Sequence, residues 1–172
     1  MLRLRRMRVG DLDRVMEIEK QSFPSPWSRA TYLSELARDN LTLYVVAELE
    51  GEVVGYAGYW YIPDEAHITT IAVDPKHRRR GIAEHMLIYL LEAAREAGGG
   101  RATLEYRVSN FAAARLYEKY GFRREGLRRG YYKDGNEDAV VANLRGLETE
   151  EYGRKLEELK AALQKRCPAE YD

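Results

Sequence analysis

A run of arginines meets a glycine where a strand-like segment of the chain passes into a helix-like one. In the stretch HRRRGIAEHML at residues 77–87, three arginines stand directly before Gly81, and an apolar helical stripe begins after it. The first N–H groups of a helix have no intrahelical acceptor, and the helix dipole adds about half a positive charge there. Glycine also lets a ligand approach the backbone closely. The stretch therefore predicts a pyrophosphate site, with a solvated basic loop as the equally simple alternative.

Glu105 is a second residue whose position points to chemistry. It lies in the middle of RATLEYRV at residues 101–108, a strand-like segment where an ionised carboxylate is usually unwelcome. Burial there would raise the pKa of the carboxyl toward the range in which a general base works. A glutamate at the strand edge, paired with Arg101 or Arg107, is the simpler interpretation of the same residue.

Composition and motifs exclude several classes of protein. The chain carries 28 Lys plus Arg and 28 Asp plus Glu, so no net positive charge draws it to nucleic acid. The arginine stretch lacks both the GK[ST] of a P-loop and the G-x-G-x-x-G of a dinucleotide fold. Cys167 is the single cysteine, so we expect neither an internal disulfide nor a C-x-x-C metal site. A nucleic-acid-binding module built on the basic N-terminus remains as a distant alternative.

The length and hydrophobic content fit one soluble domain without a membrane partner. The chain has 172 residues, of which 45% are hydrophobic, enough for an ordinary core. The basic start MLRLRRMRVG has no apolar run behind it, so it does not predict a signal peptide. No segment approaches the roughly 20 apolar residues of a membrane span. We expect a cytoplasmic protein that is a monomer or a weak homodimer.

Hydrophobic periodicity predicts strands and helices in a regular order. Turn residues mark two hairpins, at Glu50-Gly51 and at Asp134-Gly135, and Ser28 is suited to begin a helix. The order of elements is strand, two helices, three strands, helix, strand, helix and two strands, which predicts an α/β domain with helices on the faces of a mixed sheet. The predicted strands are residues 2–9, 43–49, 53–62, 66–73, 101–108 and the two that flank KDGN at 133–136, and the helices lie within 10–23, 28–37, 82–97 and 110–121.

One more helix is predicted after the last strand, in ETEEYGRKLEELKAALQKR at residues 148–166. Tyr152, Leu156, Leu159 and Leu163 form one narrow apolar stripe along it. Such a stripe favours a helix that lies on the domain or pairs with a second copy. A helix that docks a specific partner is the alternative.

The spacing Arg78-x-x-Gly81-x-Ala83 resembles the Q/R-x-x-G-x-G/A signature with which GNAT acetyltransferases hold the pyrophosphate of acetyl-CoA. The resemblance runs in the family's order over about residues 2–145. Ala83 replaces the commoner glycine, and Tyr106 stands where the family usually has valine. Five further segments carry the resemblance: SFPSPWS at 22–28, which is similar to the bacterial ribosomal-protein alanine N-acetyltransferases of the RimI type, HITTIAVDP at 67–75, LEYRVSN at 104–110, AARLYEKYGF at 113–122 and GYYKDGNEDAVV at 130–141.

The resemblance implies a GNAT fold, classed as α/β or in some schemes α+β. It implies a mixed, mostly antiparallel sheet of seven strands with four helices, in a domain at residues 1–146. Residues 147–172 are then a C-terminal helical extension.

The resemblance also implies acetyl transfer from acetyl-CoA to a primary amine without a metal, with Glu105 as base and Tyr117 as the acid for the leaving thiolate. The residues expected at the coenzyme are Ile71, Ala72, Val73, Arg79, Arg80, Gly81, Ile82, Ala83, Glu84 and Asn110, mostly through main-chain groups.

The acceptor implied by the resemblance is the N-terminal α-amine of a protein or peptide, such as the N-terminal alanine of a small-subunit ribosomal protein. An α-amine is about 3.5 kcal/mol easier to deprotonate than lysine at neutral pH, which suits a modest base. A small amine, a polyamine or a protein lysine is the alternative acceptor. His77 and His85 are expected on the surface. The residues expected to contact the acceptor are Phe23, Pro24, Trp27, Tyr131, Tyr132 and His67. His67 could also relay a proton.

Overall fold

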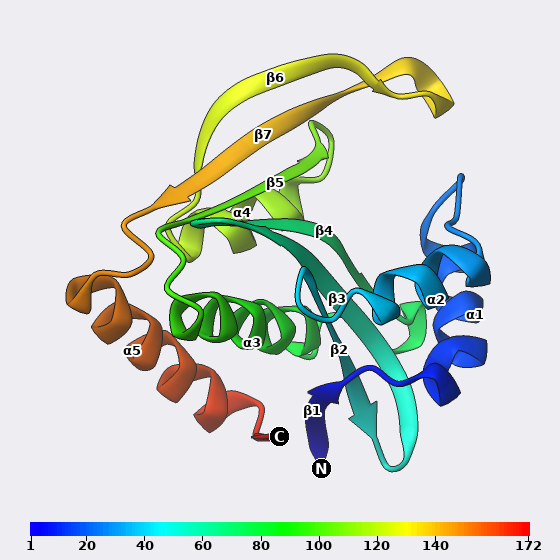
Figure 1. The fold of residues 1–172 in the computed structure, drawn as a ribbon, viewed down its shortest axis with the longest axis horizontal. Coiled ribbons are helices and arrows are strands. Elements are labelled where there is room, and N and C mark those ends of the chain that lie inside the picture. Colours follow the sequence, from blue (N-terminus) through cyan, green and yellow to red (C-terminus); the bar gives the residue numbers. More distant parts are fainter.

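Tight turns and apolar runs fold the chain into strands that are neighbours in the sheet. β2 (Thr42–Leu49) and β3 (Glu52–Ile62) are joined by Glu50 and Gly51, which both adopt positive φ, as a two-residue hairpin requires. The computed structural model describes all residues 1–172, and Figure 1 traces the sheet and its helices. The other elements are β1 (Leu2–Arg6), α1 (Leu12–Ser22), α2 (Arg29–Ala37), β4 (Glu65–Val73), α3 (Ile82–Glu96), β5 (Arg101–Arg107), α4 (Phe111–Lys119), β6 (Arg123–Tyr132), β7 (Glu137–Arg145), α5 (Glu150–Arg166), β8 (Ala169–Tyr171) and three short 3-10 turns at Val9–Asp11, Pro75–His77 and Asp134–Asn136.

Eight strands form one mixed sheet in the order β6-β7-β5-β4-β3-β2-β1-β8. Neighbouring strands are antiparallel, except that β4 runs parallel to β5 and β1 parallel to β8. The α/β class and the seven strands predicted from the sequence are confirmed, and β8 is an addition within a segment expected to be helical. The helix stops at Cys167, whose φ of −151° is extended, because Pro168 disfavours a helical residue before it. The following residues then pair with β1.

β4 and β5 share only a short stretch of ladder before they separate. Their pairing covers three positions and ends at His67, opposite Thr103. β4 continues to Val73 and β5 to Arg107, and Figure 1 shows the two strands diverging from their common end. A bulge also bends β4, because Thr69 is the extra residue between the pairs Tyr59↔Ile68 and Gly58↔Thr70. The result is a wedge in the middle of the sheet.

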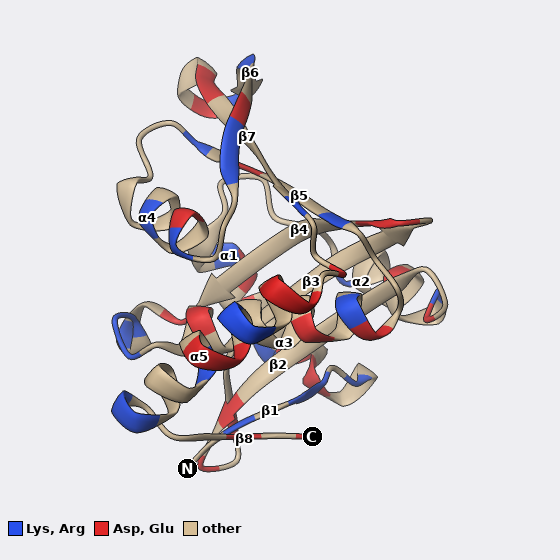
Figure 2. Cartoon of the chain, turned by 90° about the vertical axis from the view of Figure 1, so that its left-hand side faces the viewer, with Lys and Arg blue, Asp and Glu red and all other residues tan.

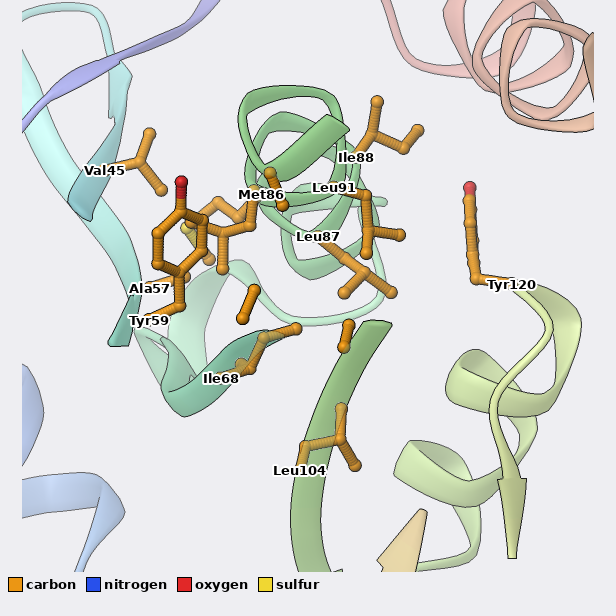
Figure 3. Close-up of a cluster of buried hydrophobic side chains, with 14 of the residues drawn as sticks. Val45, Ala57, Tyr59, Ile68, Met86, Leu87, Ile88, Leu91, Leu104 and Tyr120 are labelled. Carbon is orange, nitrogen blue, oxygen red and sulfur yellow. The ribbon is translucent and has the colours of Figure 1, made fainter. Parts of the chain in front are cut away.

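The central strands are buried on both faces, because helices cover both. In β2, Val45 belongs to the larger core around α3, whereas the next residue, Val46, belongs to a smaller core under α1 and α2. Apolar side chains of α3 recur on the face toward the sheet, and Figure 3 shows Met86, Leu87 and Leu91 between the sheet and Tyr120. This packing fixes the position of the N-terminus of α3 relative to β4.

α5 lies on the domain, as its apolar stripe predicted. Tyr152, Leu156 and Leu163 are buried and Leu159 is partly buried, all against the core around α3. Lys160 binds Glu92 of α3 at 3.0 Å. Figure 2 shows α5 beside α3, with β8 alongside β1 near both chain ends. None of the helices combines the length and the apolar character that crossing a membrane would need.

His85 was predicted on the surface, and this is wrong. The residue is in the first turn of α3 and is fully buried, because the chain after α5 covers it. Its Nε2 donates to the carbonyl of Cys167 at 2.6 Å, and its Nδ1 lies 2.8 Å from the Tyr171 hydroxyl. Burial lowers the pKa of His85, so the ring is neutral at pH 7.

Candidate active site

A cleft of about 630 Å³ opens where β4 and β5 separate. Its walls are the two strands, the segment between α1 and α2, the start of α4 and the β6–β7 hairpin. The cleft therefore collects segments from the whole length of the domain. Ten of the residues nominated from the sequence line it: Phe23, Pro24, Trp27, His67, Ile71, Glu105, Asn110, Tyr117, Tyr131 and Tyr132.

Glu105 and His67 face each other across the wedge. The Nε2 atom of His67 lies 3.0 Å from each oxygen of the Glu105 carboxylate. An ionised carboxylate has no proton to give, so Nε2 carries the hydrogen and donates it. The Glu105 side chain is only 10% exposed, against 27% for His67. Two groups 38 residues apart in sequence thus form one hydrogen-bonded pair on the floor of the cleft.

The pKa of Glu105 is lower than its usual value, which corrects the prediction that burial would raise it. The hydrogen bond from His67 is the largest cause, and it outweighs desolvation. The positive charge of Arg128 on β6 acts in the same direction. Glu105 is therefore an anion at neutral pH, able to accept a proton but weaker as a base than a buried, isolated carboxyl would be.

Tyr117 reaches the cleft from α4. Asn110 begins this helix, because its Oδ1 accepts a hydrogen bond from the N–H of Ala113 at 3.1 Å. The Tyr117 ring packs between Tyr106 and Phe122, with ring centroids 5.7 Å and 5.8 Å away. Burial raises the pKa of the Tyr117 phenol, so it keeps its proton at pH 7. The unusual Tyr106 of the sequence is thus a packing partner of Tyr117.

The turn before α3 is separate from the lining of the cleft. Arg79 and Gly81 both adopt left-handed φ, at 64° and 76°. Arg78, Arg79 and Arg80 are exposed, and no carboxylate pairs with them. Ala72 and Val73 on β4 and Ile82 on α3 have buried side chains, so they present only main-chain groups. The arginines and the first N–H groups of α3 form a cationic turn beyond the end of β4.

The side chain of Glu84 is already engaged within the protein. It accepts hydrogen bonds from Tyr120 and from Lys119, the latter at 2.9 Å, and Arg166 lies 3.7 Å away. Desolvation would raise its pKa, but these partners hold the pKa below its usual range. Any contact of Glu84 with a ligand therefore falls to its main chain, as for Ala83 beside it.

Arg107 fastens the β6–β7 hairpin over the cleft. Its guanidinium donates to Asp134 at 2.8 Å and to Glu137 at 3.2 Å. It also lies 4.1 Å from the centre of the Tyr132 ring, in a cation–π arrangement. These contacts hold Tyr131 and Tyr132 at the rim of the cleft. No sequence pattern predicts that Arg107 contacts the hairpin.

Glu19 is a residue of the cleft that sequence reasoning missed. It is 3% exposed, and its carboxylate accepts hydrogen bonds from the Tyr56 hydroxyl, from the Tyr32 hydroxyl at 2.7 Å and from the N–H of Trp27 at 2.8 Å. These partners come from β3, α2 and the segment between α1 and α2. The available signal was a glutamate one residue after Ile18, on the apolar face of α1. Glu19 therefore ties the loop that carries Trp27 to the sheet.

The family model for the acetyltransferase (GNAT) family matches residues 12–122, well over half of the chain. The chain belongs to the GNAT acetyltransferase family. Among its relatives, the N-alpha-acetyltransferase RimI of Mycobacterium tuberculosis is 42% identical over 138 residues, 77% of this chain and 85% of that protein. The ribosomal protein bS18-alanine N-acetyltransferase of Escherichia coli is 34% identical over 140 residues, 80% of this chain and 93% of that protein.

Solved structures agree with this membership. The crystal structure of the ribosomal-protein-S18-alanine N-acetyltransferase from Escherichia coli superposes with a TM-score of 0.78 and 32% identity, covering 85% of this chain and 94% of that one. The GNAT fold predicted from the sequence is thus confirmed, and the protein is an acetyl-transferring enzyme.

Replacing Glu19 by glutamine is expected to loosen the loop around Trp27. Glutamine can accept from the two tyrosines, but its NH₂ group then faces the N–H of Trp27. We expect the free energy of unfolding to fall by about 1–3 kcal/mol, and amide exchange at Trp27 to accelerate. Glu17→Gln is the control, because Glu17 is on the same helix, 64% exposed and bonded only to Arg14. Equal effects of both changes in urea unfolding would contradict the role given to Glu19.

Replacing His67 by alanine is expected to raise the pKa of Glu105 by removing its main hydrogen-bond donor. A lowered pKa stabilises the fold above the unfolded value of about 4.3, and this contribution disappears as pH falls through the lowered pKa. The free energy of unfolding of the variant should therefore fall less steeply than that of the unmodified protein as the pH is lowered. NMR titration of ¹³C-labelled glutamate, with Glu105→Gln for assignment and His77→Ala as control, measures the shift. An unchanged Glu105 pKa would refute the assignment.

Proposed function

We propose that this GNAT enzyme transfers an acetyl group from acetyl-CoA to the N-terminal α-amine of a protein, namely the N-terminal alanine of a small-subunit ribosomal protein. The observation that carries the proposal is the cleft at the β4–β5 wedge. It combines an anionic Glu105 and a protonated Tyr117 with aromatic residues from two loops. The relatives named for bS18-alanine N-acetylation support the same acceptor.

The cationic turn before α3 fits the phosphates of acetyl-CoA. Left-handed φ at Gly81 turns the chain so that α3 can begin immediately, and the unpaired Arg79 and Arg80 add positive charge beside its first N–H groups. Ile71 pairs with Ala57 of β3 on one side, but no strand pairs with it on the other side, which faces the wedge. Its main-chain groups suit the pantetheine arm, as does the side chain of Asn110 at the start of α4.

The chemistry follows from the charge states of the two nominated residues. A neutral amine attacks the thioester carbonyl, the new C–N bond forms, and the C–S bond breaks to release coenzyme A. The proton that the amine loses goes to Glu105, which is ionised and held by His67. The departing thiolate takes a proton from Tyr117, whose phenol is protonated at neutral pH. Atoms and charges balance, with one proton taken up and one given.

The aromatic residues that line the cleft favour the free N-terminus of a peptide over a small amine as the acceptor. Phe23 and Trp27 line the cleft from one loop and Tyr131 and Tyr132 line it from another, and Glu19 and Arg107 fix the positions of these two segments. A small amine would use little of this surface. The alternative acceptors, a polyamine or a lysine side chain, also require a stronger base than the hydrogen-bonded Glu105.

A peptide panel tests the acceptor. Short peptides with a free N-terminus and different first residues, peptides with a blocked N-terminus and a lysine, and spermidine are each incubated with the enzyme and acetyl-CoA. We expect mass spectrometry to show acetylation of free N-termini, most rapidly where alanine is first. Acetylation of lysine or spermidine without any acetylated N-terminus would refute the proposed acceptor.

Substitution of the two nominated residues tests the mechanism. Glu105→Gln is expected to lower kcat about 10²- to 10⁴-fold at every pH, because the amine loses its proton acceptor. Tyr117→Phe is expected to lower kcat in the same range, because the thiolate loses its proton donor. Calorimetry should give a nearly unchanged Kd for coenzyme A in both variants, with Glu118→Gln as a control on the exposed face of α4. Full turnover by both variants would refute these roles.

A further inference from the structure

The C-terminal tail, residues 167–172, lies against the turn that precedes α3. This tail and α5 fall beyond residues 12–122, which the family model matches. Cys167 donates a hydrogen bond from its Sγ to the carbonyl of Arg80. A Cβ atom added at Gly81 would lie 3.4 Å from the same sulfur and 3.1 Å from the Leu163 side chain. The tail and the end of α5 therefore form the inner wall of the turn.

The turn needs such a wall because Arg79 holds an unfavourable backbone conformation. Arg79 has a φ of 64° and Gly81 a φ of 76°, so two of three successive residues are left-handed. For a residue with a side chain, such as Arg79, this conformation costs roughly 1–2 kcal/mol. The exposed side chains of Arg78, Arg79 and Arg80 make no ion pair that would offset this cost. The contact of Cys167 with Arg80 lies between the strained Arg79 and the left-handed Gly81.

His85 connects the tail to α3 itself. Its ring is fully buried in the first turn of the helix. Because Nε2 lies 2.6 Å from the Cys167 carbonyl, it carries the hydrogen, and Nδ1 of the neutral ring accepts from the Tyr171 hydroxyl at 2.8 Å. One side chain of α3 thus contacts both ends of the tail. A change in the position of the tail must move either this ring or the turn.

We infer that the C-terminal tail is a positioning element for the coenzyme, because it holds the Arg79–Gly81 turn in the conformation that accepts the phosphates. This inference rests on the proposed function, since it needs the diphosphate of coenzyme A at the turn. Cys167 and Tyr171 act through the backbone and through His85, and neither touches the substrate. Because coupling between two sites is reciprocal, binding of coenzyme A must also stabilise the tail.

The tail also covers the edge of the sheet, and the experiment must separate the two effects. β8 pairs with β1, Asp172 donates its N–H to the Leu4 carbonyl, and its carboxylate binds Arg3. If edge protection were the whole role, weakening the tail would lower stability but leave coenzyme binding unchanged. Tyr171→Phe and Cys167→Ala keep the backbone pairing of β8 and remove the side-chain contacts of the tail with His85 of α3 and with Arg80 of the turn.

Calorimetric titration with coenzyme A, using the full-length enzyme, tests the inference. We expect the Kd for coenzyme A to rise about threefold in Tyr171→Phe and in Cys167→Ala, and about tenfold in the double variant. Such changes correspond to a coupling free energy between the tail and the coenzyme site at the lower end of the range usual for coupled sites. Cys167→Ser should restore most of the affinity, since its hydroxyl can donate to Arg80. Tyr152→Phe is the matched control, because it removes a hydroxyl near the start of α5, where it bonds to the Tyr120 carbonyl, whereas the tail follows the end of that helix.

Kinetics and amide exchange complete the test. The KM for acetyl-CoA should rise with the Kd, while kcat and the KM for the acceptor peptide stay unchanged. In the unmodified enzyme, coenzyme A should slow exchange of the Cys167 and Asp172 amides. Unchanged coenzyme affinity in the double variant, equal weakening in Tyr152→Phe, or no change in exchange would each overturn the inference. Failure of the unmodified enzyme to bind coenzyme A would instead overturn the proposed function, and the inference with it.

Discussion

The loss of backbone pairing between β4 and β5 is the constraint on which the rest of the structure depends. Parallel strands normally continue their ladder, yet here it ends at His67 and Thr103, and the bulge at Thr69 bends β4 away. The facing edges of the two strands keep main-chain groups that no strand satisfies. Such an edge inside a sheet is stable only when the surrounding layers hold the strands apart. In this molecule α3 packs on one face and α1 with α2 on the other.

Buried carboxylates complete this arrangement. Glu19 joins α1, α2 and β3 through three donors, and Glu35 of α2 accepts from Tyr44 on β2 and from Trp60 on β3. Hydroxyl, indole or amide groups donate to each of these buried carboxyls, and Arg38 also lies 3.9 Å from Glu35, so the geometry of each group is specific. The smaller core thus combines aliphatic side chains with tyrosines whose hydroxyls bind two buried carboxyls. It supports the rim of the cleft on the side of Trp27.

Local periodicity was sufficient to predict most of the fold, because the helices and strands are amphipathic or doubly buried in regular patterns. The apolar spacing from Ile82 to Ala94 and the turn at Glu50-Gly51 are examples in which nearby residues decide the structure. Motif resemblance then nominated residues such as Glu105 and Tyr117, which the cleft does bring together.

The errors came from contacts between residues far apart in the chain. Nothing near Glu105 indicates that His67 lowers its pKa, and nothing near His85 indicates that residues 82 and 86 positions later bury it. Glu19 is similar, because its partners on β3 and α2 appear only in the folded sheet. Sequence patterns report what a segment does on average, whereas pairwise hydrogen bonds across the sheet depend on where each segment finally lies.

The two tryptophans of the chain, Trp27 and Trp60, both line the cleft. Trp27 lies 5.3 Å from the ring of Tyr32, and Trp60 lies 5.8 Å from the ring of His67, between ring centroids. Since no indole is found elsewhere, the tryptophan fluorescence of the protein comes wholly from the lining of this cleft. The fluorescence of the two indoles therefore reports directly on any ligand that enters the cleft, whereas a ligand held only at the arginine turn, which does not line the cleft, can alter it only through the strands in between.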